Sequence, residues 1–225
     1  RSLVDAPFDI PKIFGFKRPT KRLVYQPLGI GYLAAGLEQA GHQAAFVDCP
    51  ALRLNIDEAL EQLEQEHPNL VGIPCFVWGR SLVYELVKRI RQAHPGLPVV
   101  LGGPQITAFA ELVFKECPEV SLALRGEADF SLAALASCIE QGKPVDDVPG
   151  VVRRDGSGDL FYGPPPEVVH DLDQIPFPAR HIYQRELYSP MPFMISQPPM
   201  PAERLITSRG CHWARCRFCY QSSSS

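Results

Sequence analysis

The feature that most constrains the fold is an alternation of short apolar runs and amphipathic segments over the first 141 residues. We interpret the apolar runs as strands, at 2–4, 44–47, 70–73, 99–101 and 122–124. Helical spacing predicts helices near 27–40, 57–66, 81–93 and 129–141, with a short one around 112–113. Strands that alternate with helices pair in parallel through right-handed crossovers. We therefore predict an α/β fold, a doubly wound five-stranded parallel sheet of the Rossmann or flavodoxin-like type.

The composition excludes several classes of protein. With 225 residues, the chain holds one large domain, or one domain and part of another. A net charge of −3 without a basic run argues against a nucleic-acid-binding surface. No apolar stretch reaches the roughly 18 residues of a membrane span, and no signal peptide is visible. Seven cysteines, an odd number without disulfide-type spacing, indicate the reducing cytoplasm.

The chain after residue 142 is rich in proline, and twelve of the 23 prolines lie between residues 144 and 201. So many prolines are incompatible with long regular elements. Within this stretch, residues 151–162 predict a small β-hairpin on an Asp-Gly turn. We expect the remainder to be an extended linker that leads to a short strand at 205–206.

Three cysteines lie within nine residues near the end of the sequence, in a C-x4-C-x2-C pattern formed by Cys211, Cys216 and Cys219. Thiolates so close together favour one soft metal centre, such as zinc or an iron–sulfur cluster. A structural zinc site needs a fourth ligand, which His212 would supply only through an awkward turn. A [4Fe–4S] cluster with one iron open to a small molecule fits the three cysteines better. Unliganded thiols are the third alternative.

The segment from Ile206 to Cys219 resembles the cluster loop of radical S-adenosylmethionine (SAM) enzymes. The usual family spacing is C-x3-C-x2-C, so this chain carries one extra residue, as variants in the cobalamin-dependent branch do. The extra residue changes the expected path of the loop and leaves the three cysteine ligands unchanged. The resemblance implies that the open iron binds SAM and that Phe218 and Tyr220 contact it.

Loops at the carboxyl ends of parallel strands are where ligands of such sheets bind. The order of these loops resembles the cobalamin-binding domain of cobalamin-dependent radical enzymes, from about residue 3 to residue 141. A lone Gly-Gly such as that at 102–103 is also typical of a tight strand-to-helix turn. The predicted cobalamin-binding residues are Asp5, Ala6, Pro7, Pro27, Leu28, Gly29, Cys75, Phe76, Val77, Trp78, Gly102, Gly103, Pro104, Gln105, Gly126 and Glu127.

One departure from the family pattern concerns the lower face of the cobalt. Many cobalamin domains carry D-x-H-x-x-G after the first strand, and its histidine ligates cobalt. Here Pro7 stands at the histidine position and has no ligating nitrogen. We therefore expect a base-off form whose lower face meets Phe76 and Trp78, unless these rings pack against a helix. Gly102 and Gly103 would then line the slot for the displaced nucleotide tail.

Together, the resemblances imply the N-terminal portion of a cobalamin-dependent radical SAM enzyme, most often a methyltransferase acting on an unactivated carbon. They imply three cofactors: a [4Fe–4S] cluster, SAM and cobalamin. The expected partners are a small-molecule or peptide substrate and a reductant such as flavodoxin or ferredoxin, with neither nucleic acid nor membrane. We expect a cobalamin-binding domain at residues 1–142, a linker at 143–203 and the start of the radical SAM domain at 204–225.

Three alternatives remain open. The same parts are used by radical enzymes that catalyse cyclisation or rearrangement. The chain is also compatible with a non-catalytic module that binds cobalamin or transfers electrons. A zinc-stabilised α/β domain is the third, and iron analysis distinguishes it from the others.

Overall fold

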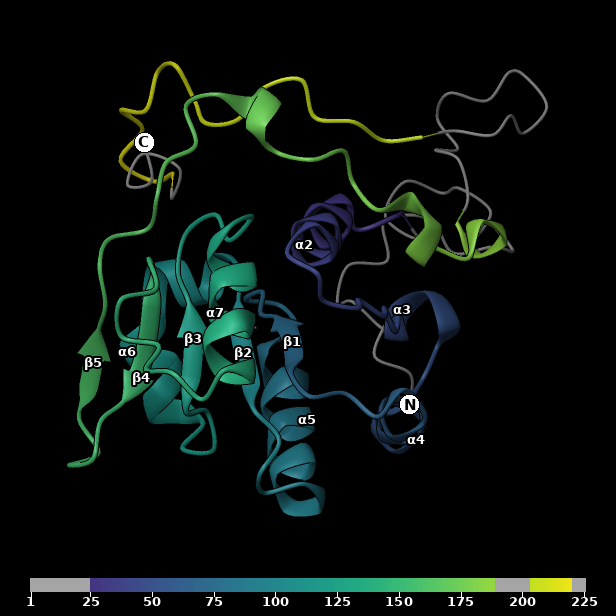
Figure 1. Ribbon diagram of the computed structural model, residues 1–225, viewed down its shortest axis with the longest axis vertical. Coiled ribbons are helices and arrows are strands. Elements are labelled where there is room, and N and C mark those ends of the chain that lie inside the picture. The colour runs from purple at the N-terminus through teal and green to yellow at the C-terminus, as the bar shows by residue number, and fades with distance from the viewer. Residues whose placement is uncertain (1–24, 189–202, 220–225) are drawn as a thin grey trace, which may run out of the picture.

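The computed structural model describes residues 25–188 and 203–219. Its centre is a five-stranded sheet in the order β1-β2-β3-β4-β5 (Figure 1). The strands are β1 (Val71–Pro74), β2 (Val99–Gly102), β3 (Leu122–Leu124), β4 (Val151–Arg154) and β5 (Leu160–Tyr162). The first three pair in parallel, whereas β4 pairs antiparallel with both β3 and β5. Four strands thus point the same way, and the predicted α/β class with a mostly parallel sheet is confirmed.

Helices cover both faces of this sheet (Figure 1). The described helices are α2 (Leu28–Gln39), α3 (Cys49–Leu52), α4 (Ile56–Glu66), α5 (Arg80–Ala93), α6 (Pro104–Glu116) and α7 (Ser131–Glu140), and α3 lies to the side of the sheet. Successive residues of a strand point to opposite faces. Leu101 therefore packs in one cluster with residues of α5 and α6, and Val100 packs in another with residues of α7. This two-sided core explains why the central strands β2 and β3 carry only apolar side chains.

Local sequence signals account for several helix ends. Asn55 and Glu58 form a reciprocal capping box at the start of α4, with hydrogen bonds of 3.0 and 2.7 Å. Pro104 occupies the first turn of α6, where a missing N–H costs nothing. The helix predicted around 112–113 is longer than expected, because it continues across a kink at Phe109.

Some predicted strands are absent from the described residues. Segment 44–47 is not a strand, and its expected partner at 2–4 lies outside the described residues. Segment 205–206 is not a strand either, and Leu205 is 70% exposed. A strand requires a neighbour that accepts and donates its ladder hydrogen bonds, and no described strand lies beside either segment.

The second half of the sheet comes from the proline-rich stretch. The predicted hairpin exists as β4 and β5, and it extends the sheet beside β3. Its positive φ angle lies at Gly158 (+91°), so the tight two-residue Asp-Gly turn is replaced by a longer loop over 155–159. The described rest of the stretch, up to residue 188, contains three short 3-10 helices, at Leu172–Gln174, Arg180–Ile182 and Arg185–Leu187.

Among the described residues, none of the helices is both long and apolar enough to cross a membrane.

Candidate functional site

The site is built at the carboxyl edge of β1, β2 and β3. The amide of Cys75, directly after β1, donates to the Gly102 carbonyl at 2.8 Å. The Cys75 carbonyl in turn accepts from the Gln105 amide at 3.2 Å. These bonds join the loop after β1 to the loop after β2. The backbone of Cys75 thus connects the two loops, whereas its side chain is fully buried in the core.

The backbone conformation at position 103 requires a glycine. Its φ of 92° and ψ of −176° belong to a region that is essentially restricted to glycine. A Cβ atom at this position would also approach the Cys75 carbonyl oxygen to 3.2 Å. Gly103 therefore lets the start of α6 approach the end of β1 closely, whereas a Cβ atom on Gly102 would make an ordinary contact of 3.9 Å with the Leu124 carbonyl oxygen.

Thr107 joins the loops after β2 and β3, and sequence analysis missed it. Its hydroxyl donates to the Gly103 carbonyl at 3.1 Å and accepts from the Gly126 amide at 2.9 Å. A hydroxyl residue in the first turn of a helix that follows a Gly-Gly loop was the available signal. The partner, nineteen residues away in sequence, was not visible before the fold was known.

We expect Thr107→Val to lower the free energy of unfolding by about 1–3 kcal/mol, because it leaves the Gly126 amide without its acceptor. The near-isosteric valine keeps the volume, so the loss comes from the hydroxyl. Thr107→Ser is the matched control and should retain most of the stability. Urea unfolding measures both, and equal stability of Thr107→Val and the wild type would show that the bridge contributes nothing.

An exposed aromatic pair follows β1. The rings of Phe76 and Trp78 stack with centroids 5.1 Å apart and an interplanar angle of 13°. Trp78 is 82% exposed, and Val77 between them is exposed as well. Trp78 thus does not pack into the domain, and the stacked pair is exposed at this edge of the sheet.

The loop after β3 is partly covered by the linker. A Cβ atom on Gly126, whose φ is 76°, would lie 2.4 Å from the Cβ atom of Pro166. Packing against Pro166 therefore explains this glycine. The neighbouring Glu127 accepts a hydrogen bond from Arg209 at 2.9 Å.

The other predicted residues are placed as follows. Leu28 is buried at the start of α2, and the Pro27 carbonyl accepts from the Tyr183 hydroxyl at 3.0 Å. Gly29 and Pro104 are exposed, and Gln105 is buried. Asp5, Ala6, Pro7 and Tyr220 lie outside the described residues.

Three buried polar atoms lack hydrogen-bond partners among the described residues. They are Oε1 of Gln26, two residues before α2, Nε2 of His94, directly after α5, and Nε of Arg125, directly after β3. Buried polar groups are normally satisfied. Of these, only Arg125 directly follows a strand at the carboxyl edge.

The three cysteines of the C-x4-C-x2-C pattern are half-buried, and their thiols are not oxidised to disulfides. Hydrogen bonds from the backbone amides of Ala214 and Trp213 lower the pKa of Cys211. A lowered pKa favours the thiolate, which is the form that binds metal. No group of three His, Cys, Asp or Glu side chains in the described ranges is close enough to hold a metal ion. The ligand chemistry fits a cluster, but this conformation does not bring the three thiols together.

Phe218 is 93% exposed, so its ring is free to stack on a ligand.

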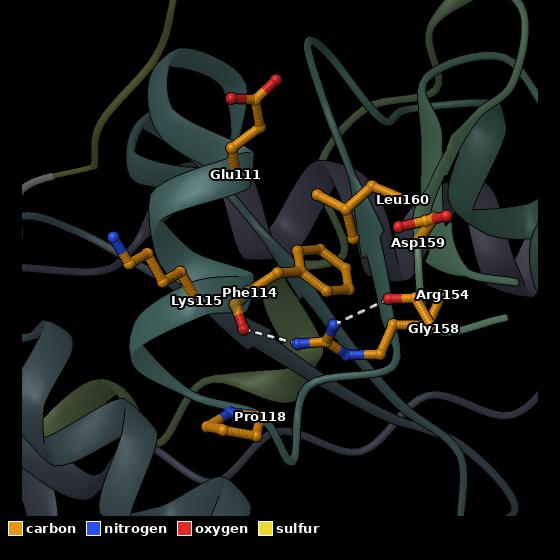
Figure 2. A pocket seen from close by; sticks show the side chains of 8 residues that line it. All are labelled: Glu111, Phe114, Lys115, Pro118, Arg154, Gly158, Asp159 and Leu160. Carbon is orange, nitrogen blue, oxygen red and sulfur yellow. Dashed lines mark hydrogen bonds between the residues drawn. The ribbon is translucent and has the colours of Figure 1, made fainter.

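A separate hollow lies between α6 and the hairpin (Figure 2). Arg154 crosses it and donates to the carbonyls of Phe114 and Gly158 at 2.5 and 3.2 Å. Phe114 lies toward the C-terminal end of α6, whereas the candidate site is at the N-terminal end of that helix. The hollow is therefore not part of the candidate site.

Comparison with known proteins places these loops in a family context. A family model described as "B12 binding domain" matches residues 20–136. An uncharacterized methyltransferase of Pyrococcus horikoshii is 26% identical over 87% of this chain and 40% of its own length. Anaerobic magnesium-protoporphyrin IX monomethyl ester cyclase of Rubrivivax gelatinosus is 26% identical over 88% of this chain and 35% of its own.

Among solved structures, the cobalamin-dependent SAM radical enzyme OxsB with aqua-cobalamin bound is similar in fold, with a TM-score of 0.68. It is 22% identical, and the match covers 85% of this chain and 25% of OxsB. The chain therefore spans less than half the length of each of these relatives.

Proposed function

The chain belongs to the family of B12-binding domains, and from this premise we propose that it is the cobalamin-binding part of a radical SAM methyltransferase. The observation that carries the proposal is the exposed Phe76–Trp78 stack at the carboxyl edge, directly after the residue whose backbone bonds to Gly102. An exposed aromatic pair beside a glycine turn, where backbone can approach a ligand closely, suits a corrin ring and its nucleotide tail.

Cobalamin would lie across the carboxyl edge with its lower face against Phe76 and Trp78. Gly102 and Gly103 would leave room for the displaced nucleotide tail. Since Pro7 has no ligating nitrogen, we expect cobalamin in the base-off form.

Cys211, Cys216 and Cys219 would hold a [4Fe–4S] cluster, and the exposed Phe218 would stack on the adenine of SAM, with Tyr220 nearby. When bound, these cofactors supply an electron, a radical that abstracts hydrogen, and a methyl group. The protein's own task is to orient the groups and exclude water from them. Segment 204–225 is thus proposed to begin the radical SAM domain, after the cobalamin domain at 1–142 and the linker at 143–203.

The methyl-transfer assignment rests on the Pyrococcus horikoshii relative, and the Rubrivivax gelatinosus cyclase favours ring closure as a second candidate. We propose a small molecule as substrate and a flavodoxin or ferredoxin as reductant. The acidic net charge of −3 gives no support for a nucleic-acid partner. Free thiols and an oxygen-sensitive cluster suit the cytoplasm.

The test is anaerobic absorbance after incubation with hydroxocobalamin and removal of unbound corrinoid. Near-stoichiometric corrinoid with a base-off spectrum is expected. A spectrum of histidine-ligated cobalt would contradict the lower-face assignment. Absence of retained corrinoid, with circular dichroism showing a folded domain, would contradict cobalamin binding at this edge.

Trp78→Ala is expected to weaken corrinoid binding about tenfold, because an aromatic contact contributes roughly 1–1.5 kcal/mol. The melting temperature should not change, since Trp78 is 82% exposed. Trp213→Ala is the matched control, because Trp213 is the other tryptophan of the chain and is 59% exposed within the cysteine segment. Equal affinities of the two variants in a corrinoid titration would remove Trp78 from the site.

A further inference from the structure

The cysteine segment, residues 203–219, lies over the edge of the sheet without regular secondary structure (Figure 1). Most of its residues are exposed, but the side chain of Arg209 is only 17% exposed. Arg209 lies two residues before Cys211, the first cysteine of the pattern. Arg209 is thus the least exposed arginine of a mostly exposed segment, and its side chain is one point where that segment is attached to the domain.

Arg209 makes a forked contact with Asp129, which lies in the loop between β3 and α7. Its two terminal nitrogens donate to the two carboxylate oxygens of Asp129 at 2.6 and 3.0 Å. The first nitrogen also donates to Glu127 at 2.9 Å. Paired, charge-assisted bonds of this kind are stronger and more directional than ordinary hydrogen bonds.

Asp129 depends on this contact. Its side chain is 7% exposed, and among the described residues it has no other salt bridge. The backbone of Asp129 packs closely against α2, since a Cβ atom on Gly36 would lie 2.5 Å from the Asp129 carbonyl oxygen. The guanidinium also lies over the ring of Tyr32 in α2, 5.2 Å from its centroid. The receiving site for Arg209 is therefore formed by two closely packed elements of the domain, the loop after β3 and α2.

Two further arginine contacts hold the beginning of the segment. Arg180 pairs with Glu203 and donates to the Arg204 carbonyl at 2.7 Å. Arg204 donates to the Gln26 carbonyl at 3.4 Å. These contacts limit where the segment starts, whereas Arg209 determines where the cysteines begin.

We propose that Arg209 is a positioning residue whose ion pairs with Asp129 and Glu127 latch the cysteine segment to the carboxyl edge of the sheet. The latch keeps the first cysteine beside the loop that follows β3. Its consequence for the spacing of corrin and cluster rests on the proposed function; the latch itself does not.

Limited trypsin digestion of the protein tests the latch without any cofactor. In the wild type, the bond after Arg209 should be cut more slowly than the bond after Arg215, which is exposed in the same segment. Asp129→Asn removes the charge of the main partner of Arg209. It should raise the rate of cutting after Arg209, relative to the rate after Arg215, about tenfold. Glu127→Gln removes one bond to a half-exposed carboxylate and should raise the ratio less.

Arg153→Gln is the matched control, because Arg153 and Asp146 form a similar forked pair, at 2.6 and 2.8 Å, away from the cysteine segment. It should leave the ratio unchanged. Cutting after Arg209 as fast as after Arg215 in the wild type would overturn the latch. An unchanged ratio in both Asp129→Asn and Glu127→Gln would overturn it too.

Magnetic coupling between cob(II)alamin and the reduced cluster tests positioning by electron paramagnetic resonance. A defined coupling in the wild type, broadened in Asp129→Asn, is the expected result. Identical coupling in both, despite a changed cleavage ratio, would overturn the positioning role. Failure of the wild type to retain corrinoid or iron would contradict the proposed function, while the cleavage ratio would still decide the latch.

Discussion

Replacing any one of Cys211, Cys216 or Cys219 by serine is expected to lower the iron retained after anaerobic reconstitution from about four atoms per chain to below about one. A cluster held by three protein thiolates has no spare ligand, so each loss should be as severe as the others. The charge-transfer absorbance of the cluster near 400 nm should disappear in parallel. Corrinoid retention should persist, because the carboxyl-edge loops do not include these cysteines.

Cys138→Ser provides the control for the cysteine series. Cys138 is a half-buried cysteine in α7, outside the C-x4-C-x2-C pattern. Its replacement should leave iron content at the wild-type level. Full iron retention in any of the three motif variants would contradict the cluster assignment, and zinc in place of iron would support the zinc-stabilised alternative.

Gly103→Ala is expected to lower the free energy of unfolding by about 1–3 kcal/mol, because its backbone lies in a region that alanine avoids. The added methyl group must also displace the Cys75 carbonyl, 3.2 Å away, and with it the bond to the Gln105 amide. The loop after β1 would then shift together with Phe76 and Trp78. We therefore expect corrinoid affinity to fall at least about tenfold.

Gly79→Ala is the matched control at the same edge. Gly79 has a φ of −107°, and a Cβ atom there would meet nothing within 4 Å. Its replacement should change stability by less than about 0.5 kcal/mol and leave corrinoid binding intact. Urea unfolding and corrinoid titration of both variants check this, and equal stability of Gly103→Ala and the wild type would show that the strained turn is unimportant.

The sequence predicted the elements with strong periodicity. The helices α4 and α5 agree with their predicted ranges to within a residue or two, since an apolar stripe at helical spacing is a local property. The strands β1 to β3 were found for a similar reason, because runs of apolar residues need burial on both faces. The segments 44–47 and 205–206 have the apolar composition of strands but lack a described strand partner. Composition alone does not show whether such a partner exists.

The predicted loops at the carboxyl edge could be named from topology, since all parallel strands end at the same edge. The hydrogen bonds that join these loops to one another could not be predicted from the sequence. Thr107 looks like an ordinary residue of the first helical turn, and only the fold places the Gly126 amide above its hydroxyl. Gly126 itself resembled a ligand-binding glycine, although Pro166 from the linker accounts for it.

The sequence by itself determined the α/β class and the set of three thiols that could bind a metal centre. Apolar periodicity and cysteine spacing are both properties of residues close together in the chain. Only the tertiary structure decided that the hairpin completes the sheet beside β3, and that Arg209 meets Asp129 across 80 residues of sequence. Such pairs form where the packing of distant elements brings opposite charges or open edges together. No local pattern encodes that placement, since each partner alone resembles an ordinary solvated side chain or an isolated hairpin.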